Sequence, residues 1–244
     1  MTEDVEELQL DKKTTTEDFL SHMLKSISDG IVPLKTLEIT NVLLTDPKAK
    51  LLAQILTNAK CQITNLELVE CRAKSDKMGL IFGALQRNQS VANLNLTGTS
   101  IAKESLAEFV NLLSQSRTLN MLTLFNSGLS DSSIMALAPG FKNNKGLVYL
   151  DIRQNTFENE GFKHFTESIT GLKNLQTLRI NGMLMGEPEV NILRKLLSHQ
   201  NCAIENLEME ELDVQEGMSP GVINAVSTLK RLLTFDFSNN RLQP

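Results

Sequence analysis

The side chains best suited to catalysis or metal binding are few in this chain of 244 residues. Three histidines and three cysteines are present: His22, His164, His199, Cys61, Cys71 and Cys202. The cysteine spacing matches neither a zinc site nor a redox pair, and the chain has no phosphate-binding glycine loop and no H-E-x-x-H motif. We expect the histidines to lie on three separate helices, too far apart for a catalytic triad. The chain is therefore predicted not to be an enzyme and to need no metal or cofactor.

A second group of side chains is better suited to binding. Met121, Phe125, Tyr149, Arg153 and Arg179 fall in one stretch of the sequence, and Tyr149 is the single tyrosine of the chain. Aromatic residues, methionine and arginine are enriched where protein interfaces concentrate their binding energy. Whether these residues meet depends on the elements that carry them.

Those elements are set by a repeat. The pattern L-x-x-L-x-L returns nine times at intervals of 28 or 29 residues, which is typical of a solenoid built from stacked units. The units begin at Val5, Leu34, Ile63, Val91, Leu119, Leu147, Leu175, Ile204 and Leu232. We expect a single repeat domain over residues 1–244, with an incomplete last unit.

Each unit is predicted to be a strand followed by a helix. Counting from the first residue of a unit, apolar residues at positions 4 and 6 alternate as in a half-buried strand. Apolar residues at positions 16, 19 and 23, such as Met78, Ile81 and Leu85, follow the spacing of an amphipathic helix. Strands and helices in constant order predict an α/β fold with a parallel sheet. Because packed helices are spaced more widely than strands, we expect a horseshoe with the sheet on its concave face and the helices on its convex face.

Two segments carry a family resemblance. Residues 58–71 (NAKCQITNLELVEC) and residues 143–157 (NNKGLVYLDIRQNTF) resemble leucine-rich repeats of the ribonuclease-inhibitor subtype, which have Asn or Cys at position 9. At that position Cys71, Asn155 and Asn240 match, whereas Val42, Thr99, Ser127, Met183 and Leu212 depart, which puts the usual hydrogen-bonded ladder in question over several turns. The resemblance implies binding of a protein partner. Related proteins also include GTPase activators and eukaryotic-like bacterial effectors.

The predicted concave face presents the side chains at positions 3, 5 and 7 of each strand. Met121, Phe125 and Tyr149 then lie on adjacent strands beside Arg153 and Arg179, and we interpret this group as an interface hot spot. In the alternative interpretation the aromatic residues are incidental and the arginines merely pair with Asp151.

A second candidate on the same face is acidic. Glu208 and Glu210, together with Glu211 and Asp236, could dock a basic segment of a partner through charge complementarity. The alternative is a solvated, charged face without a partner.

Charge, hydrophobicity and cysteine content indicate which partners and which cellular compartment to expect. The net charge of −5 argues against nucleic acid as the partner, and neither a secretory signal nor a membrane-spanning run is recognised. The incomplete cysteine pairing favours a reducing compartment. We therefore expect a cytoplasmic protein without membrane contact or, if it is a bacterial effector, secretion into the host cytosol without a classical signal peptide.

The last unit has a strand but no following helix. This would leave a free strand edge and an apolar surface formed by Leu232, Phe235, Phe237 and Leu242. Either the natural chain is longer, or residues 219–228 fold over this surface. Weak end-to-end self-association, which would also cover it, is a further alternative. Taken together, these patterns predict a non-enzymatic protein-interaction scaffold. The alternatives are a GTPase-activating or GTPase-regulating repeat protein and a structural spacer.

Overall fold

The computed structural model describes residues 6–12, 16–29, 34–73, 76–156, 159–181, 184–214 and 217–240. Eight α-helices lie within these ranges: α1 Glu17–Ser28, α2 Asp46–Thr57, α3 Lys77–Arg87, α4 Leu106–Gln115, α5 Asp131–Asn143, α6 Asn159–Ile169, α7 Glu187–Leu197 and α8 Ser219–Val226. A 3₁₀ turn, η1 Lys103–Ser105, precedes α4. The starting residue Val5 of the first predicted repeat and Leu242 of the last lie outside the described residues.

Nine strands form one parallel sheet in chain order. They are β1 Glu7–Asp11, β2 Thr36–Thr40, β4 Asn65–Val69, β6 Asn93–Asn95, β7 Met121–Thr123, β8 Tyr149–Asp151, β9 Thr177–Arg179, β11 Asn206–Glu208 and β13 Thr234–Asp236. Every strand begins at position 3 of its predicted repeat, and the register pairs equal positions, so that Leu122, Leu150 and Leu178 stand side by side. The predicted α/β fold with a parallel sheet is confirmed.

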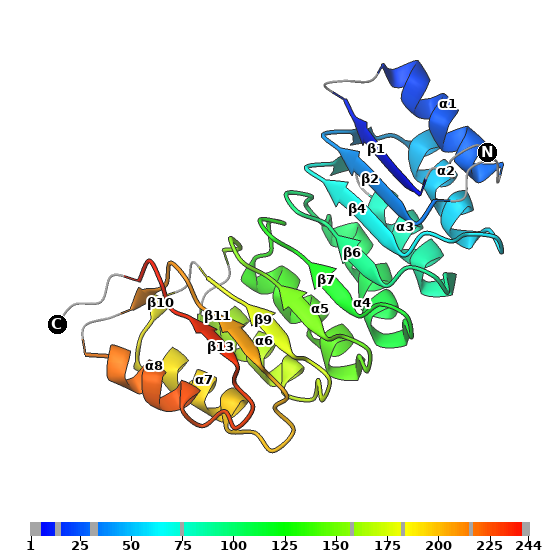
Figure 1. Cartoon of the computed structure of the whole chain (residues 1–244). Helices are drawn as coiled ribbons and strands as arrows, with labels where there is room; N and C mark the ends of the chain where they lie inside the picture. The colour runs from blue at the N-terminus through cyan, green and yellow to red at the C-terminus, as the bar shows by residue number, and fades with distance from the viewer. Residues whose placement is uncertain are drawn as a thin grey trace.

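The helices cover one face of this sheet and leave the other face open, in an elongated stack that runs from the N-terminal to the C-terminal repeats (Figure 1). Alternation along the strands explains this arrangement, because Leu37 and Ile39 of β2 are buried while Glu38 between them is partly exposed. We call the surface formed by positions 3, 5 and 7 the open sheet face. None of the helices in the described part of the chain combines the length and apolarity needed to cross a bilayer.

The core lies between the sheet and the helices. Met78, Ile81 and Leu85 of α3 are buried, as their spacing predicted. Aromatic rings join neighbouring helices: the rings of Phe82 and Phe109 stack with centroids 4.5 Å apart, and those of Phe141 and Phe165 meet edge to face at 5.9 Å. Such pairs add to the free energy gained from burying apolar area.

Position 9 forms a hydrogen-bonded ladder beneath the sheet from Cys71 to Asn155, and again at Asn240. Asn155 donates to the carbonyl of Leu124 at 2.7 Å and accepts the backbone N–H groups of Ser127 and Leu129. Thr99 and Ser127 take the same place with hydroxyl groups, donating to carbonyls of the preceding repeat at 2.7 and 2.9 Å. The ladder therefore passes through two positions where the departure from the family pattern had put it in question. Val42 and Leu212 are buried without such a bond, and Met183 lies outside the described residues.

A second set of asparagines was missed from the sequence. Asn88 and Asn144 follow the ends of α3 and α5, where each side chain donates to a carbonyl of the preceding repeat at 2.7 Å and accepts from the turn that leads into the next strand. Both residues are buried. They join each helix-to-strand turn to its neighbour.

Position 8 bends the chain sharply after most of the strands. In repeats two to six, eight and nine the residue at this position has a positive φ angle, between 49° and 65°: Asn41, Glu70, Gly98, Asn126, Gln154, Glu211 and Asn239. Glycine and asparagine tolerate this left-handed conformation, whereas glutamate and glutamine adopt it at a cost. The repeat therefore imposes the turn even where the local residue opposes it.

The last described strand, β13, pairs only with β11 among the described strands. The helix α8, which contains most of the 219–228 segment, packs against α7 and buries Val222 and Val226. Leu233 remains 75% exposed, and the rings of Phe235 and Phe237 stack at 5.5 Å while staying only partly buried. Self-association through this edge stays a prediction.

The positive φ angle at position 8 can be tested with two glycines. Gly98→Ala should lower the free energy of unfolding by about 1 kcal/mol or more, because the new Cβ would require a strained backbone and would lie 3.0 Å from Cγ of Glu70. Gly83→Ala is the matched control: it lies within α3 with open space around it, and should raise the stability by about 0.5–1 kcal/mol. Urea denaturation measures both, and equal effects of the two substitutions would contradict this account of the turn.

Candidate functional site

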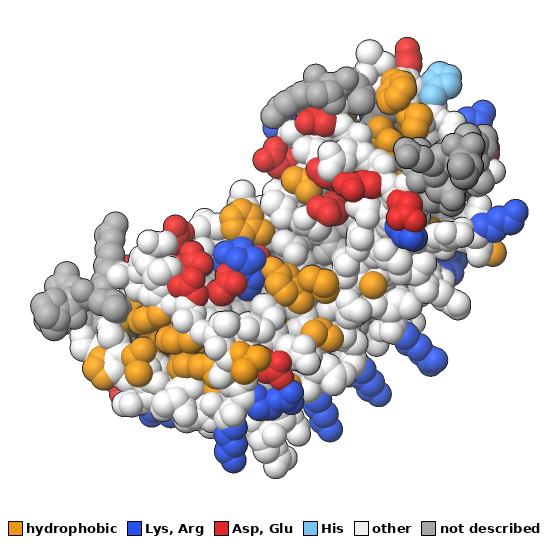
Figure 2. All heavy atoms as spheres, viewed as in Figure 1, with side chains coloured by type: hydrophobic (Ala, Val, Ile, Leu, Met, Phe, Trp, Pro, Cys, Tyr) orange, Lys and Arg blue, Asp and Glu red, His pale blue; other side chains and the backbone are white. Residues whose placement is uncertain are grey.

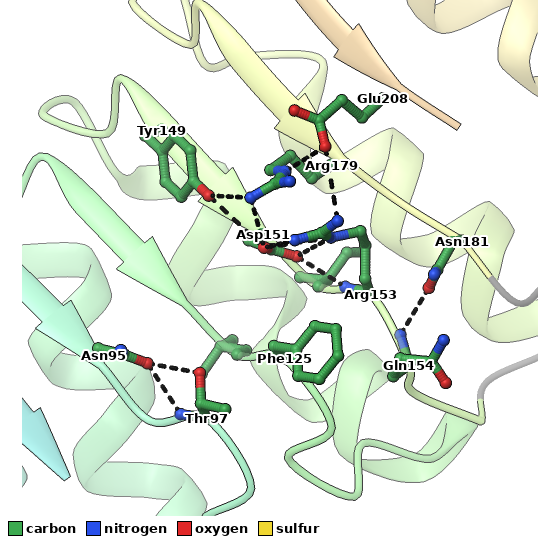
Figure 3. A network of polar contacts seen from close by, with 12 residues as sticks. Asn95, Thr97, Phe125, Tyr149, Asp151, Arg153, Gln154, Arg179, Asn181 and Glu208 are labelled. Carbon is green, nitrogen blue, oxygen red and sulfur yellow. Dashed lines mark hydrogen bonds and ion pairs between the residues drawn. The ribbon is translucent and has the colours of Figure 1, made fainter. Parts of the chain in front are cut away.

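Asp151 is the centre of a polar network on the open sheet face (Figure 3). Its carboxylate accepts the Nε and Nη2 groups of Arg153 at 3.1 and 2.8 Å, and the backbone N–H of Arg153 at 3.0 Å. Arg179 approaches the same carboxylate with Nη1 at 3.5 Å. One carboxylate therefore orients two arginines.

Arg179 extends the network across the sheet. Its Nε pairs with the carboxylate of Glu208, and its Nη1 donates to the hydroxyl of Tyr149 at 3.1 Å. Arg153 also reaches Glu208, with 3.5 Å between Nη1 and Oε2. We call Tyr149, Asp151, Arg153, Arg179 and Glu208 the arginine cluster.

Strand register brings the arginine cluster together. Asp151, Arg179 and Glu208 all occupy position 5 of their repeats, and the parallel register places them directly opposite one another on β8, β9 and β11. Opposite charges at directly opposed positions stabilise a sheet. The order acid, base, acid on three successive strands is thus the local reason why the side chains meet.

The cluster is substantially buried although it lies on the open face. Asp151 is 2% exposed, and the side chains of Arg153 and Arg179 are 15% and 26% exposed. Partial burial lowers the pKa of each arginine, but hydrogen bonds and charged neighbours raise it by more. For Arg153 the partner is Asp151, and for Arg179 the partners are Tyr149 and Glu208. Both pKa values therefore lie above the ordinary value. The two positive and two negative charges cancel formally.

Apolar side chains border the arginine cluster on β7 and just beyond it. The guanidinium carbon of Arg153 lies 5.5 Å from the ring centroid of Phe125, a cation–π contact. Met121 stands opposite Tyr149 in the sheet and is 40% exposed. Figure 2 shows hydrophobic side chains beside grouped basic and acidic ones in this region of the open face.

The structure brings together seven of the eight predicted binding residues: Met121, Phe125, Tyr149, Asp151, Arg153, Arg179 and Glu208. The pairing of the arginines with Asp151, which was the alternative interpretation, is also observed. It makes the guanidinium groups fixed parts of the surface. The eighth residue, Glu210, lies outside this network and interacts with Asp236.

The predicted acidic docking site is partly compensated within the chain. Glu208 is paired with arginine, and Glu211 accepts the side-chain amide of Gln154 at 2.8 Å. Asp236 accepts the backbone N–H of Ser238, and this bond lowers the pKa of Asp236 below its usual value. Three of these four acidic residues, Glu208, Glu211 and Asp236, therefore have basic or hydrogen-bond-donating partners within the chain.

A different acidic pair was missed from the sequence. Glu38 and Glu67 occupy position 5 of β2 and β4 and stand directly opposite each other, an arrangement that destabilises a sheet. They accept hydrogen bonds from Thr40 at 3.0 Å and Asn95 at 2.9 Å, and neither forms an ion pair with any residue in the described ranges. Their equal repeat position was the available signal.

The residues considered for catalysis are dispersed. His22 lies on α1 and His164 on α6, whereas His199 follows the end of α7, so the expectation of three helices is wrong for His199. Burial raises the pKa of the Cys71 thiol to about 11, which opposes formation of a nucleophilic thiolate. Among the described residues, no group of three or more His, Cys, Asp or Glu side chains is placed to hold a metal ion.

The structural role of Asp151 gives a prediction. Asp151→Asn keeps the shape of the side chain but leaves two partly buried arginines without their shared anion, so the free energy of unfolding should fall by about 1–3 kcal/mol. Asp213→Asn, at an exposed site, is the matched control and should change the stability by less than about 0.5 kcal/mol. Chemical denaturation distinguishes the two, and an unchanged midpoint for Asp151→Asn would show that the anion does not hold the cluster.

Comparison with known proteins gives distant relatives. No family model matches the chain. It is 22% identical over 238 residues to mouse NACHT, LRR and PYD domains-containing protein 4E, covering 86% of this chain and 24% of that protein. Human NACHT, LRR and PYD domains-containing protein 13 is 24% identical over 193 residues, covering 67% of this chain and 18% of that protein. Protein CARMIL of Dictyostelium discoideum is 21% identical over 222 residues, covering 86% of this chain and 21% of that protein. The chain thus spans about a quarter or less of the length of these relatives.

A solved structure supports the same fold. The chain named Leiomodin-1 Actin-Binding Site 2 (ABS2) superposes with a TM-score of 0.50 at 20% sequence identity, covering 64% of this chain and 89% of that one. The repeat period, the parallel sheet with helices on one face, and these likenesses agree. The chain has the character of a leucine-rich repeat protein.

Proposed function

We propose that this chain is a non-enzymatic scaffold that binds a protein partner on its open sheet face. We take that face to be the concave side of a curved solenoid of the ribonuclease-inhibitor subtype. The binding site is the arginine cluster with Met121 and Phe125 beside it. One observation carries this assignment: Asp151 holds two arginines in place next to an aromatic ring and an exposed methionine, on a surface whose other described residues at positions 3, 5 and 7 are polar except Val69.

The two arginines are already held in place in the free protein, and this favours binding. Ordering a long side chain at an interface costs free energy, and this cost is smaller when the side chain is already held in the free protein. Arg153 is held between Asp151 and Phe125, and Arg179 is held by Tyr149 and Glu208. A partner therefore meets a preformed surface.

The chemistry of the site favours a particular kind of partner. Because the charges within the arginine cluster cancel, the main attraction at its centre is burial of apolar or aromatic side chains against Met121 and Phe125. The carboxylates of Glu38 and Glu67, which form no ion pair with a described residue, lie on the same sheet face towards the N-terminus. A partner segment with an apolar anchor and nearby basic residues would complement both features.

The three cysteines are free thiols. A cytoplasmic location stays a prediction. An origin as a secreted bacterial effector stays a prediction, as does a single domain over residues 1–244. Regulation of a GTPase also stays a prediction. Both candidate arginines already have anionic partners within the chain, and this pairing gives no support for an arginine that acts on a nucleotide.

Binding to a protein partner gives a direct test. Phe125→Ala and Tyr149→Ala should each weaken binding by about 1 kcal/mol or more, roughly fivefold in Kd, because each removes an aromatic side chain from the proposed centre. Phe19→Ala is the matched control: Phe19 lies on α1 and is 50% exposed, and its removal should leave the Kd within error.

Actin is the first defined partner to measure, because the similar leiomodin structure bears the name of an actin-binding site. A partner captured from native lysate by the wild-type chain is the second. Undiminished binding by both Phe125→Ala and Tyr149→Ala, or an equal loss for Phe19→Ala, would place the site elsewhere.

A further inference from the structure

A row of basic side chains lies along the edge of the solenoid where each helix turns into the next strand. We call Arg87, Arg117, Lys142, Lys145 and Lys173 the basic edge. They belong to four consecutive turns, which precede β6, β7, β8 and β9. Figure 2 shows basic side chains projecting from the lower edge of the molecule, along the turns that lead into the strands (Figure 1).

The four turns are in contact. Gln86 at the end of α3 donates to Gln115 at the end of α4 at 2.7 Å. Asn144 donates to the carbonyl of Leu113, and Asn174 to the carbonyl of Lys145. Basic side chains that are 25 or more residues apart in the sequence are therefore neighbours along one edge.

The positive charge of this edge is uncompensated. All five side chains are exposed, and none forms an ion pair with a described residue. Residues 85–92, 113–120, 141–148 and 169–176 contain no aspartate or glutamate, although acidic residues outnumber basic ones in the chain. Like charges gathered without counter-charges repel one another.

Helix capping explains only part of this pattern. Arg87 and Lys142 lie in the last turns of α3 and α5, where a cation interacts favourably with the helix dipole. Arg117, Lys145 and Lys173 lie beyond the helix ends, each two residues before the start of a repeat. Recurrence at this position in three successive repeats is not accounted for by capping.

We propose that the basic edge binds an extended acidic segment of a partner protein, independently of the open sheet face. Neighbouring turns are separated by about 5 to 10 Å, between the spacing of strands and that of helices. An extended peptide rises about 3.3 Å per residue, so aspartate or glutamate at every second or third position would meet successive turns.

The surroundings favour a narrow acidic segment over a broad anionic surface. None of the exposed large hydrophobic side chains lies in these four turns, so the edge offers nothing to insert into a lipid layer. It also presents no exposed aromatic ring for stacking on nucleic-acid bases. The net charge of −5 repels extended anionic surfaces, whereas a single peptide segment contacts the basic edge alone.

Fluorescence anisotropy with a labelled peptide of about 10 residues, alternating glutamate and serine, tests the proposal. The wild-type chain should bind it, and binding should weaken as salt is raised. Arg117→Glu/Lys145→Glu should raise the Kd about tenfold. Arg72→Glu/Lys103→Glu is the matched control, with the same change in charge near the opposite ends of the strands, and should alter the Kd less than about twofold.

Four results would overturn the proposal. They are no binding of the acidic peptide, equal binding of its glutamine analogue, an equal loss in the control variant, and tighter binding of phosphatidylserine vesicles or duplex DNA than of the peptide. Circular dichroism of each variant establishes that the charge reversals leave the fold intact.

Discussion

The in-register stacking of parallel strands is the constraint on which the other features depend. Each strand places a leucine or phenylalanine at position 4 against the same position of its neighbours, so that the buried face is continuous along the sheet. A shift of one residue would turn these side chains outwards. Because this register is held, every other position of the repeat also becomes a row across the molecule. The polar ladder at position 9 and the bend at position 8 are two such rows.

Equivalent surface positions of successive repeats form rows of charged side chains. At position 5 the order Asp151, Arg179, Glu208 gives a row whose charges are already paired with one another. The same position in β2 and β4 brings Glu38 and Glu67 together, an unfavourable arrangement for stability that nevertheless creates negative potential. The basic edge is a third row, formed by turns. The chain thus segregates its charges by repeat position.

Much of this organisation could be predicted from the sequence, because apolar spacing determines which residues face the core. The strands, helices and candidate site residues followed from that spacing. The ladder at Thr99 and Ser127 did not, since a hydroxyl can replace an amide as donor only when the carbonyl of the preceding repeat lies within reach. The left-handed bend at Glu70 and Gln154 also had no local signal, because it is imposed by the neighbouring repeats. The sequence left open whether Arg153 and Arg179 face a partner or pair with Asp151. In the structure the buried carboxylate of Asp151 holds both arginines beside the apolar residues.

The central claim is that a partner covers the open sheet face at the arginine cluster. Hydroxyl-radical footprinting tests it directly, because two methionines of nearly equal exposure lie on different faces: Met121 on the open sheet face at 40% and Met135 on helix α5 at 42%. In the complex, oxidation of Met121 should fall severalfold while that of Met135 stays unchanged, since only the first is covered. Protection of Met135 with Met121 still fully reactive would contradict the claim and move the interface to the helical face.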